Sequence, residues 1–263
     1  MQVKVKQIIS VLTATLFIIL TFSAWNFGFE INDIFILTLL PLGILIYHVN
    51  LDCNLKLKHV NYDITVKSDS KYYHLFRGKL LPKIRSIIFS FIVIFVFIWQ
   101  YVNASYNELV ITGLSPLITG AGYILVHQFF KTHYLPPFDQ TKAMHTTVII
   151  GGTIIFFSLW FNAYYVETSD SKLFEWALSE AIIKNSANAK GENSLLFPFI
   201  ELANAFETLK IWSVVHLRAY LPGKVFYFLP IILSLDTAMI GFILPRVTVL
   251  MVYFIETEVM KFK

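Results

Sequence analysis

Cysteine and charge are both scarce in this chain of 263 residues. Charged residues make up 14% of the chain and hydrophobic residues 56%, which excludes disordered, fibrous and ordinary soluble proteins. Cys53 is the single cysteine, so an intramolecular disulfide and a cysteine-based metal cluster are both excluded. We interpret Cys53 as a plain free thiol, with lipidation beside the membrane as the alternative.

Recognisable catalytic motifs are missing as well. The chain contains no Gly-x-Ser-x-Gly, no His-Glu-x-x-His and no glycine-rich phosphate loop. The histidine boxes of membrane di-iron enzymes have closely spaced histidines. No two of the seven histidines in this chain are three or four residues apart. We therefore expect no metal and no cofactor, and a membrane metalloenzyme is the least favoured function. No internal repeat is found, so the inverted-repeat design of many transporters has no support.

Apolar stretches, in contrast, recur along the whole chain. A membrane-spanning helix needs roughly 20 mostly apolar residues. The sequence predicts about six such helices, at residues 8–25, 34–49, 86–102, 109–130, 146–166 and within 225–255, the last being long or kinked near Pro245. The predicted fold class is thus an all-α integral membrane protein.

Lysines and arginines fall almost entirely on alternate loops. They precede the first predicted span and crowd the loop 50–85, which holds eight of them against three aspartates. The positive-inside rule then predicts a cytoplasmic N-terminus and a multi-pass protein of the inner (plasma) membrane. Because this bias accounts for most of the net charge of +4, we expect no nucleic-acid partner.

Two loops are long enough to hold structure of their own. From residue 55 to 66 apolar and polar residues alternate, and turn residues separate this run from 72–76, which predicts a small cytoplasmic β-hairpin. The segment 167–224 carries nearly balanced charges and predicts external amphipathic helices over 171–184 and 195–220, with Trp176 and Trp212 dipping into the membrane interface.

These features divide the chain into five segments. They are a first transmembrane hairpin (1–49), a basic cytoplasmic loop (50–85), a three-helix transmembrane segment (86–166), an external amphipathic segment (167–224) and a C-terminal transmembrane helix (225–263).

Small residues mark the predicted spans 109–130 and 146–166. Such residues let a second backbone approach closely, so these two helices are expected to pack inside the bundle and to face each other. Helix packing is favoured here over a solute pathway, and it also suits association with other membrane subunits or with a second copy of the chain. The predicted packing residues are Gly113, Gly120, Gly122, Gly151 and Ser158.

Asp236 is the strongest single candidate for a functional residue. An acid inside a spanning helix is costly and normally faces a partner, a cavity or a proton path. We predict that it pairs with a polar group of another helix or of a neighbouring subunit, such as Arg246 from another copy. A pair within one helix is disfavoured, since ten residues place Asp236 and Arg246 on different faces. In the alternative, Asp236 lines a transport path together with Asn162 and His127.

The sequence as a whole favours a non-enzymatic subunit of a larger envelope complex, of the secretion, conjugation or defence type. Such a subunit acts through helix packing and through contacts with the lipid bilayer and with partner subunits. The alternative function is a small-solute or ion transporter or channel that uses Asp236.

Overall fold

The computed structural model describes residues 2–28, 37–65, 79–102, 104–163, 177–186, 196–217 and 234–260. The regular structure in these ranges consists of α-helices, π-helical turns and one short 3₁₀ turn. None of the described residues is in a strand. The elements are α1 (Gln2–Gly28), α2 (Leu39–Thr65), α4 (Leu80–Val102), α5 (Tyr106–Lys131), α6 (Phe138–Phe161), α7 (Leu178–Ser186), α8 (Phe197–Leu217), α11 (Leu235–Phe254) and the π-helical turn η5 (Ile255–Val259).

Several helix starts follow directly from the sequence. The Ser105 side chain accepts a hydrogen bond from the Glu108 backbone N–H, and the Glu108 side chain accepts one from the Ser105 backbone N–H, so a capping box begins α5. Pro41, Pro82 and Pro198 lie in the first turns of α2, α4 and α8, where a missing N–H costs nothing. Local chemistry therefore defines where these helices begin.

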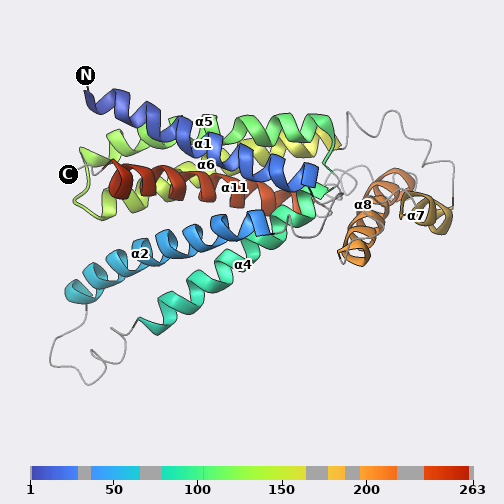
Figure 1. Cartoon of the computed structure of the whole chain (residues 1–263), viewed down its shortest axis with the longest axis horizontal. Helices are drawn as coiled ribbons and strands as arrows, with labels where there is room; N and C mark the ends of the chain where they lie inside the picture. Colours follow the sequence, from blue (N-terminus) through green and yellow to red (C-terminus); the bar gives the residue numbers. More distant parts are fainter. Residues whose placement is uncertain are drawn as a thin grey trace.

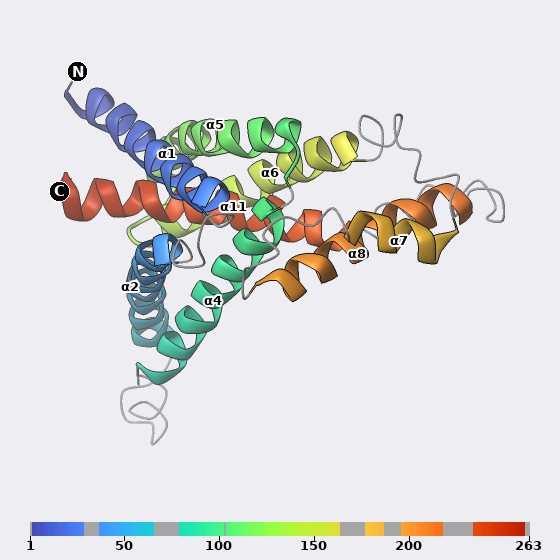
Figure 2. The same cartoon turned by 45° about the vertical axis from the view of Figure 1, so that its right-hand side comes forward.

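The helices form three groups (Figures 1 and 2). Helices α1, α5, α6 and α11 run side by side as a bundle, and both chain termini lie at one end of it. The antiparallel pair α2 and α4 joins the bundle at its other end and diverges from it toward the end that carries the termini. The pair α7 and α8 lies at the end opposite the termini.

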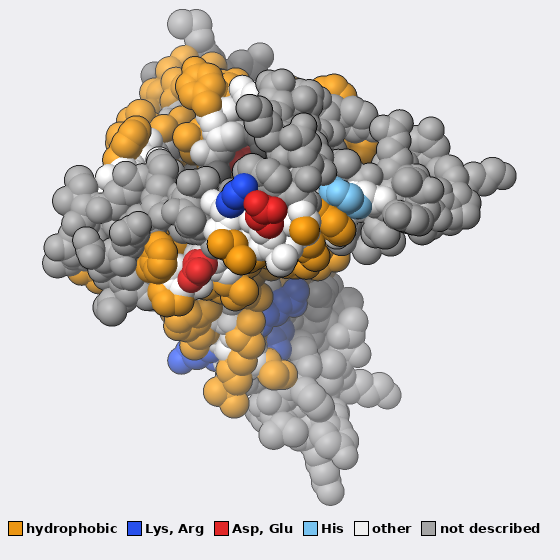
Figure 3. Space-filling model, turned by 90° about the vertical axis from the view of Figure 1, so that its right-hand side faces the viewer, with side chains coloured by type: hydrophobic (Ala, Val, Ile, Leu, Met, Phe, Trp, Pro, Cys, Tyr) orange, Lys and Arg blue, Asp and Glu red, His pale blue; other side chains and the backbone are white. Residues whose placement is uncertain are grey.

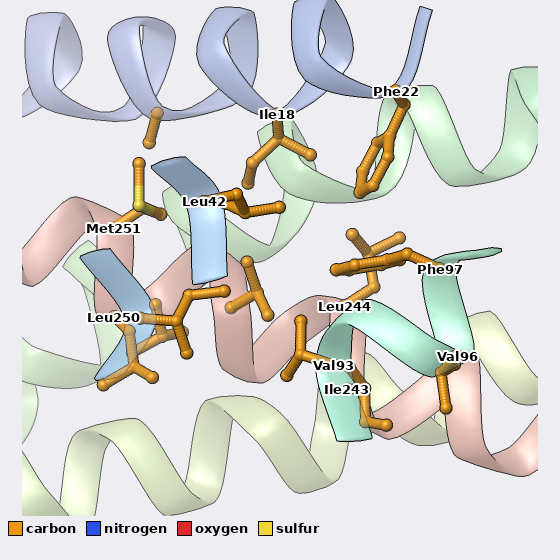
Figure 4. Close-up of a cluster of buried hydrophobic side chains, with 14 of the residues drawn as sticks. Ile18, Phe22, Leu42, Val93, Val96, Phe97, Ile243, Leu244, Leu250 and Met251 are labelled. Atoms are coloured by element: carbon orange, nitrogen blue, oxygen red, sulfur yellow. The ribbon is translucent and has the colours of Figure 1, made fainter. Parts of the chain in front are cut away.

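The core is organised around α11. This helix contacts α1, α2, α4, α5 and α6. Of the residues in its apolar 18-residue stretch, 67% are buried inside the protein, against 28–39% for the other candidate spans. Figure 4 shows one part of the core, where Ile18 and Phe22 of α1 and Phe97 of α4 surround Leu244 of α11. The Phe22 and Phe97 rings lie 4.4 Å apart between centroids, which ties the α2–α4 pair to α1.

Five helices are long and apolar enough to cross a membrane: Val5–Gly28, Leu80–Gln100, Tyr106–Lys131, Phe138–Phe161 and Leu235–Val259. Their outward faces carry exposed leucine, isoleucine and phenylalanine, such as Leu16, Phe91 and Leu125 at 60–69% exposure. In water such faces would be unfavourable, whereas lipid solvates them. Figure 3 shows hydrophobic side chains gathered along the arm formed by the α2–α4 pair. The prediction of an all-helical protein of the membrane class is therefore supported.

The structure contradicts one predicted element and describes another only in part. The predicted first strand at residues 55–66 is helical through Thr65, because α2 continues past its apolar half with the Asp52–Lys56 ion pair supporting an extra turn. The turn and second strand of that hairpin lie outside the described residues. The predicted span 34–49 is only partly described, and α2 is not among the five candidate spans. Glu256, in the last turn of the helical bundle, is buried.

The remaining boundaries differ mainly in length. Helix α6 begins at Phe138, eight residues before the predicted span, and α11 runs through Pro245 as one α-helix. Of the predicted external helices, α7 and α8 cover residues 178–186 and 197–217, while 171–176 and 218–220 lie outside the described residues. Residues 225–233 of the last predicted span lie outside them too.

Candidate functional site

Asp236 has a partner within the same chain. It lies in the first turn of α11, where the helix dipole favours a negative charge. Its Oδ2 atom accepts a hydrogen bond of 2.5 Å from the Lys210 ammonium of α8, and the two side chains are only 18% and 7% exposed. Arg246 of the same chain is about 15 Å further along α11 at a rise of 1.5 Å per residue, and a pair with Arg246 of another copy stays a prediction. The ion pair thus fastens α8 to the start of α11.

Aromatic rings reinforce this attachment of α8. Phe199 of α8 lies edge-on to Phe95 and Trp99 of α4, with ring centroids 5.2 Å apart in both pairs. Beside these rings a cavity of about 280 Å³ is lined almost wholly by apolar atoms of α4, α8 and α11. Asp236 is at its edge, and its second oxygen, Oδ1, is buried without a hydrogen bond in the described part of the chain.

Asn162 and His127 lie near opposite ends of the bundle. Asn162 is buried at the C-terminal end of α6, the end nearest α7 and α8. His127 lies in the last part of α5, toward the end that carries the termini. The structure therefore groups Asn162 with the Asp236 end of the bundle and separates both from His127.

His127 belongs to a buried polar cluster that we call the His127 cluster, made of His127, Asp139, Tyr123, Ser10 and Glu256. Its Nε2 atom is 3.4 Å from Oδ2 of Asp139, the acid in the first turn of α6, and the Asp139 side chain is 4% exposed. The Tyr123 ring stacks on the imidazole at 5.5 Å, and its hydroxyl is buried without a hydrogen-bond partner among the described residues. From α1, the Ser10 hydroxyl donates to Glu256 over 3.5 Å.

This cluster gathers polar groups from α1, α5, α6 and the π-helical turn. Turns of the π type are rare and are found frequently at functional sites. A buried imidazole–carboxylate pair can hold or pass a proton, because the carboxylate stabilises the protonated ring. The His127 cluster is thus the best candidate in the described chain for acid–base chemistry.

A second polar network joins α2, α4 and α11. The Arg246 guanidinium donates from Nη2 to Oδ1 of Asn50 over 3.3 Å, and the Asn50 amide donates to the Ser86 hydroxyl over 3.2 Å. Asn50 and Ser86 are buried. Both partners are neutral, so this network orients the guanidinium without neutralising its charge.

Helix α2 also meets α11 through Lys56. The Lys56 ammonium lies 2.6 Å from Asp52 and donates to the Tyr253 hydroxyl over 2.9 Å. Burial alone would lower the pKa of Lys56, but the hydrogen bonds to Asp52 and Tyr253 outweigh it and raise the pKa above its ordinary value. Burial raises the pKa of the nearby Cys53 thiol to about 11. Lys56 therefore stays charged and Cys53 stays neutral at physiological pH.

The predicted packing residues behave differently from one another. A methyl group on Gly120 would lie 2.8 Å from Val11 of α1, and one on Gly151 would lie 3.3 Å from Thr119 of α5. Gly113 and Gly122 face open space, and Ser158 is exposed, with its hydroxyl bonded to the carbonyl of Ile154. The closest backbone approach is between α6 and α11, at Gly152 against Phe242 and Gly241 against Phe156. Gly152 and Gly241 were not singled out by the sequence pattern.

Lys210 and Asp139 are also candidates that the sequence pattern does not reveal. Lys210 belongs to a run of charges typical of an exposed helix, and Asp139 follows two prolines in a connection. One signal exists for Lys210, because it lies seven residues after Ala203 and ten after Ile200, on the buried face of α8. Its burial depends on where α8 docks, which local sequence does not specify.

Within the described ranges, no group of three or more histidine, cysteine, aspartate or glutamate side chains is arranged to hold a metal ion. Comparisons with protein-family models, with characterised proteins and with solved structures gave no match. The function of the chain is therefore inferred from its own geometry.

Proposed function

We propose that this chain is a non-catalytic, multi-pass subunit of a larger membrane assembly, of the secretion, conjugation or defence type. It would act by holding its helices and its partners together. The observation that supports this most is the Lys210–Asp236 ion pair. The carboxylate that a transporter would leave available to its solute is engaged here in fastening α8 to α11.

The proposal includes a sixth membrane crossing made by α2. Helices α1 and α4 run in the same direction along the bundle, and α2 runs back between them. If α1 and α4 both cross the bilayer, α2 has to return the chain. The apolar part of α2 before Asn50 would then lie in the inner (plasma) membrane, with its charged part reaching into the cytoplasm.

In this arrangement α7 and α8 form an external platform for a partner protein. Exposed apolar side chains on it, Ile183 at 67% and Leu202 at 61%, alternate with the charged residues Glu180, Lys184 and Glu201. Figure 3, which faces this end, shows hydrophobic side chains mixed with charged ones of both signs. Exposed apolar side chains among polar and charged ones are common in protein interfaces.

The test is purification from the native membrane in mild detergent, followed by mass spectrometry of the proteins that remain bound. We expect a defined set of partners whose recovery falls at least several-fold in Leu202→Gln. The matched control Glu201→Gln changes an exposed side chain one position away and should retain them. A wild-type chain that purifies alone as a homo-oligomer would contradict the proposal.

The second candidate is a transporter of protons or small cations, and the His127–Asp139 pair favours it. In liposomes with an imposed pH gradient, a transporter predicts ion flux that is lost in Asp139→Asn and in Asp236→Asn, with assembly intact. A packing role predicts no flux in the wild type, and a lower yield or altered oligomeric state for Asp236→Asn. Flux through the wild-type protein would favour the transporter.

A further inference from the structure

Arg246 is a partly buried cation that the described chain leaves without an anionic partner. Its one hydrogen bond in the structure goes from Nη2 to the neutral Asn50 amide, which leaves most of its five N–H donors available. The side chains that act on it electrostatically are Cys53, Arg85 and Tyr123, a thiol, a second cation and a phenol. No carboxylate of the described residues is among them.

Further ionisable groups lie near this position. His145 of α6 lies within electrostatic range of Arg246, of Arg85 on α4 and of Lys142 on its own helix. Asp52, the nearest acid along α2, is bound to Lys56 at 2.6 Å. Arg246 of α11 and Arg85 of α4 therefore bring two positive charges to one region, and no carboxylate of the described residues compensates Arg246 there.

A partly buried arginine without a counter-charge is costly, and an anion reduces that cost. The guanidinium fork matches the oxygens of a phosphate group, with which it forms two parallel charge-assisted hydrogen bonds. In a membrane the phosphate at highest local concentration belongs to lipid headgroups, and basic pockets between membrane helices bind anionic ones. We propose that Arg246, Arg85 and Asn50 form a binding site for the phosphate of an anionic phospholipid.

The helices beside this site have the amphipathic pattern that a phospholipid needs. On α4, Arg85 is followed on the same face by Ile88 and Ile92, which are 53% and 40% exposed. On α6, exposed Lys142 and His145 are followed by Ile149, which is 62% exposed. Both helices run away from the end that carries the termini, so each places basic groups near that end and apolar groups deeper.

The hydrogen bonds from Arg246 to Asn50 and from Asn50 to Ser86 place the proposed site between α11 and the α2–α4 pair. The α2–α4 pair diverges from the bundle toward the end that carries the termini, as both ribbon views show. Arg246 is two helical turns before Tyr253, whose hydroxyl meets the charged Lys56 of α2. Its long side chain can therefore reach the headgroup region by snorkelling. The bound headgroup would sit between the α2–α4 pair and the bundle.

The experiment compares thermal unfolding of the full chain in nanodiscs of phosphatidylcholine alone and of phosphatidylcholine mixed with phosphatidylglycerol. The wild type should unfold at a higher temperature in the anionic discs. Arg246→Met should bind the anionic lipid about tenfold more weakly, as expected for the loss of a charged hydrogen-bond donor. Lys131→Met, an exposed cation at the same end of the bundle, is the matched control and should respond like the wild type.

The sign of the effect in neutral lipid separates this site from a structural role of Arg246. If Arg246 serves to bind an anion, its charge is uncompensated in neutral lipid. Arg246→Met should then be at least as stable as the wild type in phosphatidylcholine alone. If it serves only to bond Asn50, Arg246→Met should lose the same stability in both kinds of disc, which would overturn the proposal. Arg85→Gln should weaken the response to anionic lipid to a smaller extent.

A further arm identifies the source of the phosphate. Inorganic phosphate is added to the neutral discs at constant ionic strength. If it raises the unfolding temperature of the wild type but not of Arg246→Met, while the anionic lipid does not, the ligand is a soluble anion and the lipid proposal is wrong. Native mass spectrometry should show anionic lipid bound to the wild type and depleted in Arg246→Met.

Discussion

The Lys210 ammonium and the Asp236 carboxylate stabilise each other in a place where neither is fully solvated. Removing one member of a buried ion pair leaves the other charge without compensation, at a cost of about 3 kcal/mol. Lys210→Met and Asp236→Leu should therefore each lower the unfolding temperature strongly, and the double variant should recover much of the loss. A double-mutant cycle on detergent-solubilised protein measures the coupling.

The exposed pair Lys184–Glu180 provides the control for that cycle. Its side chains are 45% and 53% exposed, so Lys184→Met should change the free energy of unfolding by no more than about 0.5 kcal/mol. Strictly additive effects of Lys210→Met and Asp236→Leu would show that the two side chains do not interact in the folded protein.

Cys53 gives a residue-scale prediction about pH. Burial raises its pKa from 9.0 to about 11, so at pH 8 the thiolate is about 100-fold rarer than on an unperturbed cysteine. Alkylation by iodoacetamide should be correspondingly slow in the folded protein and should accelerate as the pH approaches 11. Because the unfolded thiol ionises first, the contribution of Cys53 to stability should fall as pH rises above about 9. Equal labelling rates with and without denaturing detergent at pH 8 would contradict a buried thiol.

At the scale of elements, the α6–α11 contact depends on two glycines that let the helices approach. A methyl group on Gly241 would lie 3.2 Å from the backbone nitrogen of Phe156, which cannot move without moving α6. Gly241→Ala should therefore destabilise the protein by about 1–3 kcal/mol. Thermal unfolding in detergent measures the change.

Gly113→Ala is the matched control for that helix contact. It makes the same substitution inside α5 at a position with nothing within 4 Å, and the effect should stay within about 0.5 kcal/mol. A Gly241→Ala variant as stable as Gly113→Ala would mean that α6 and α11 do not pack as closely as described.

The elements also show how far sequence patterns reach. Helices α1, α4, α5, α6 and α11 are predictable because each holds a long apolar run, which in a bilayer has one stable conformation. The second half of α2 is not, because alternation over residues 55–66 fits a strand as well as a helix with charges paired at i and i+4. The partners of Asp236 and His127 were unpredictable for another reason. Lys210 and Asp139 lie on other helices, and only tertiary packing brings them near.

On the scale of the whole molecule, polar interactions occur at both ends of an apolar bundle. One end carries the Lys210–Asp236 pair and the α7–α8 platform, and the other carries the His127 cluster. Between them the close glycine contacts of α6 and α11 leave little space. This distribution suits a protein whose ends meet different surroundings and whose middle serves to hold them in register.

The central place of α11 has a consequence for biosynthesis. This helix follows α1, α2, α4, α5 and α6 in the chain and contacts all of them, so the ribosome makes it after the helices that surround it. Until it enters the membrane, the faces of α5 and α6 that contact it lack this partner. A nascent chain stopped before Leu235 would therefore expose these helix faces to lipid, which is the kind of incomplete packing that membrane quality-control proteases and chaperones can detect.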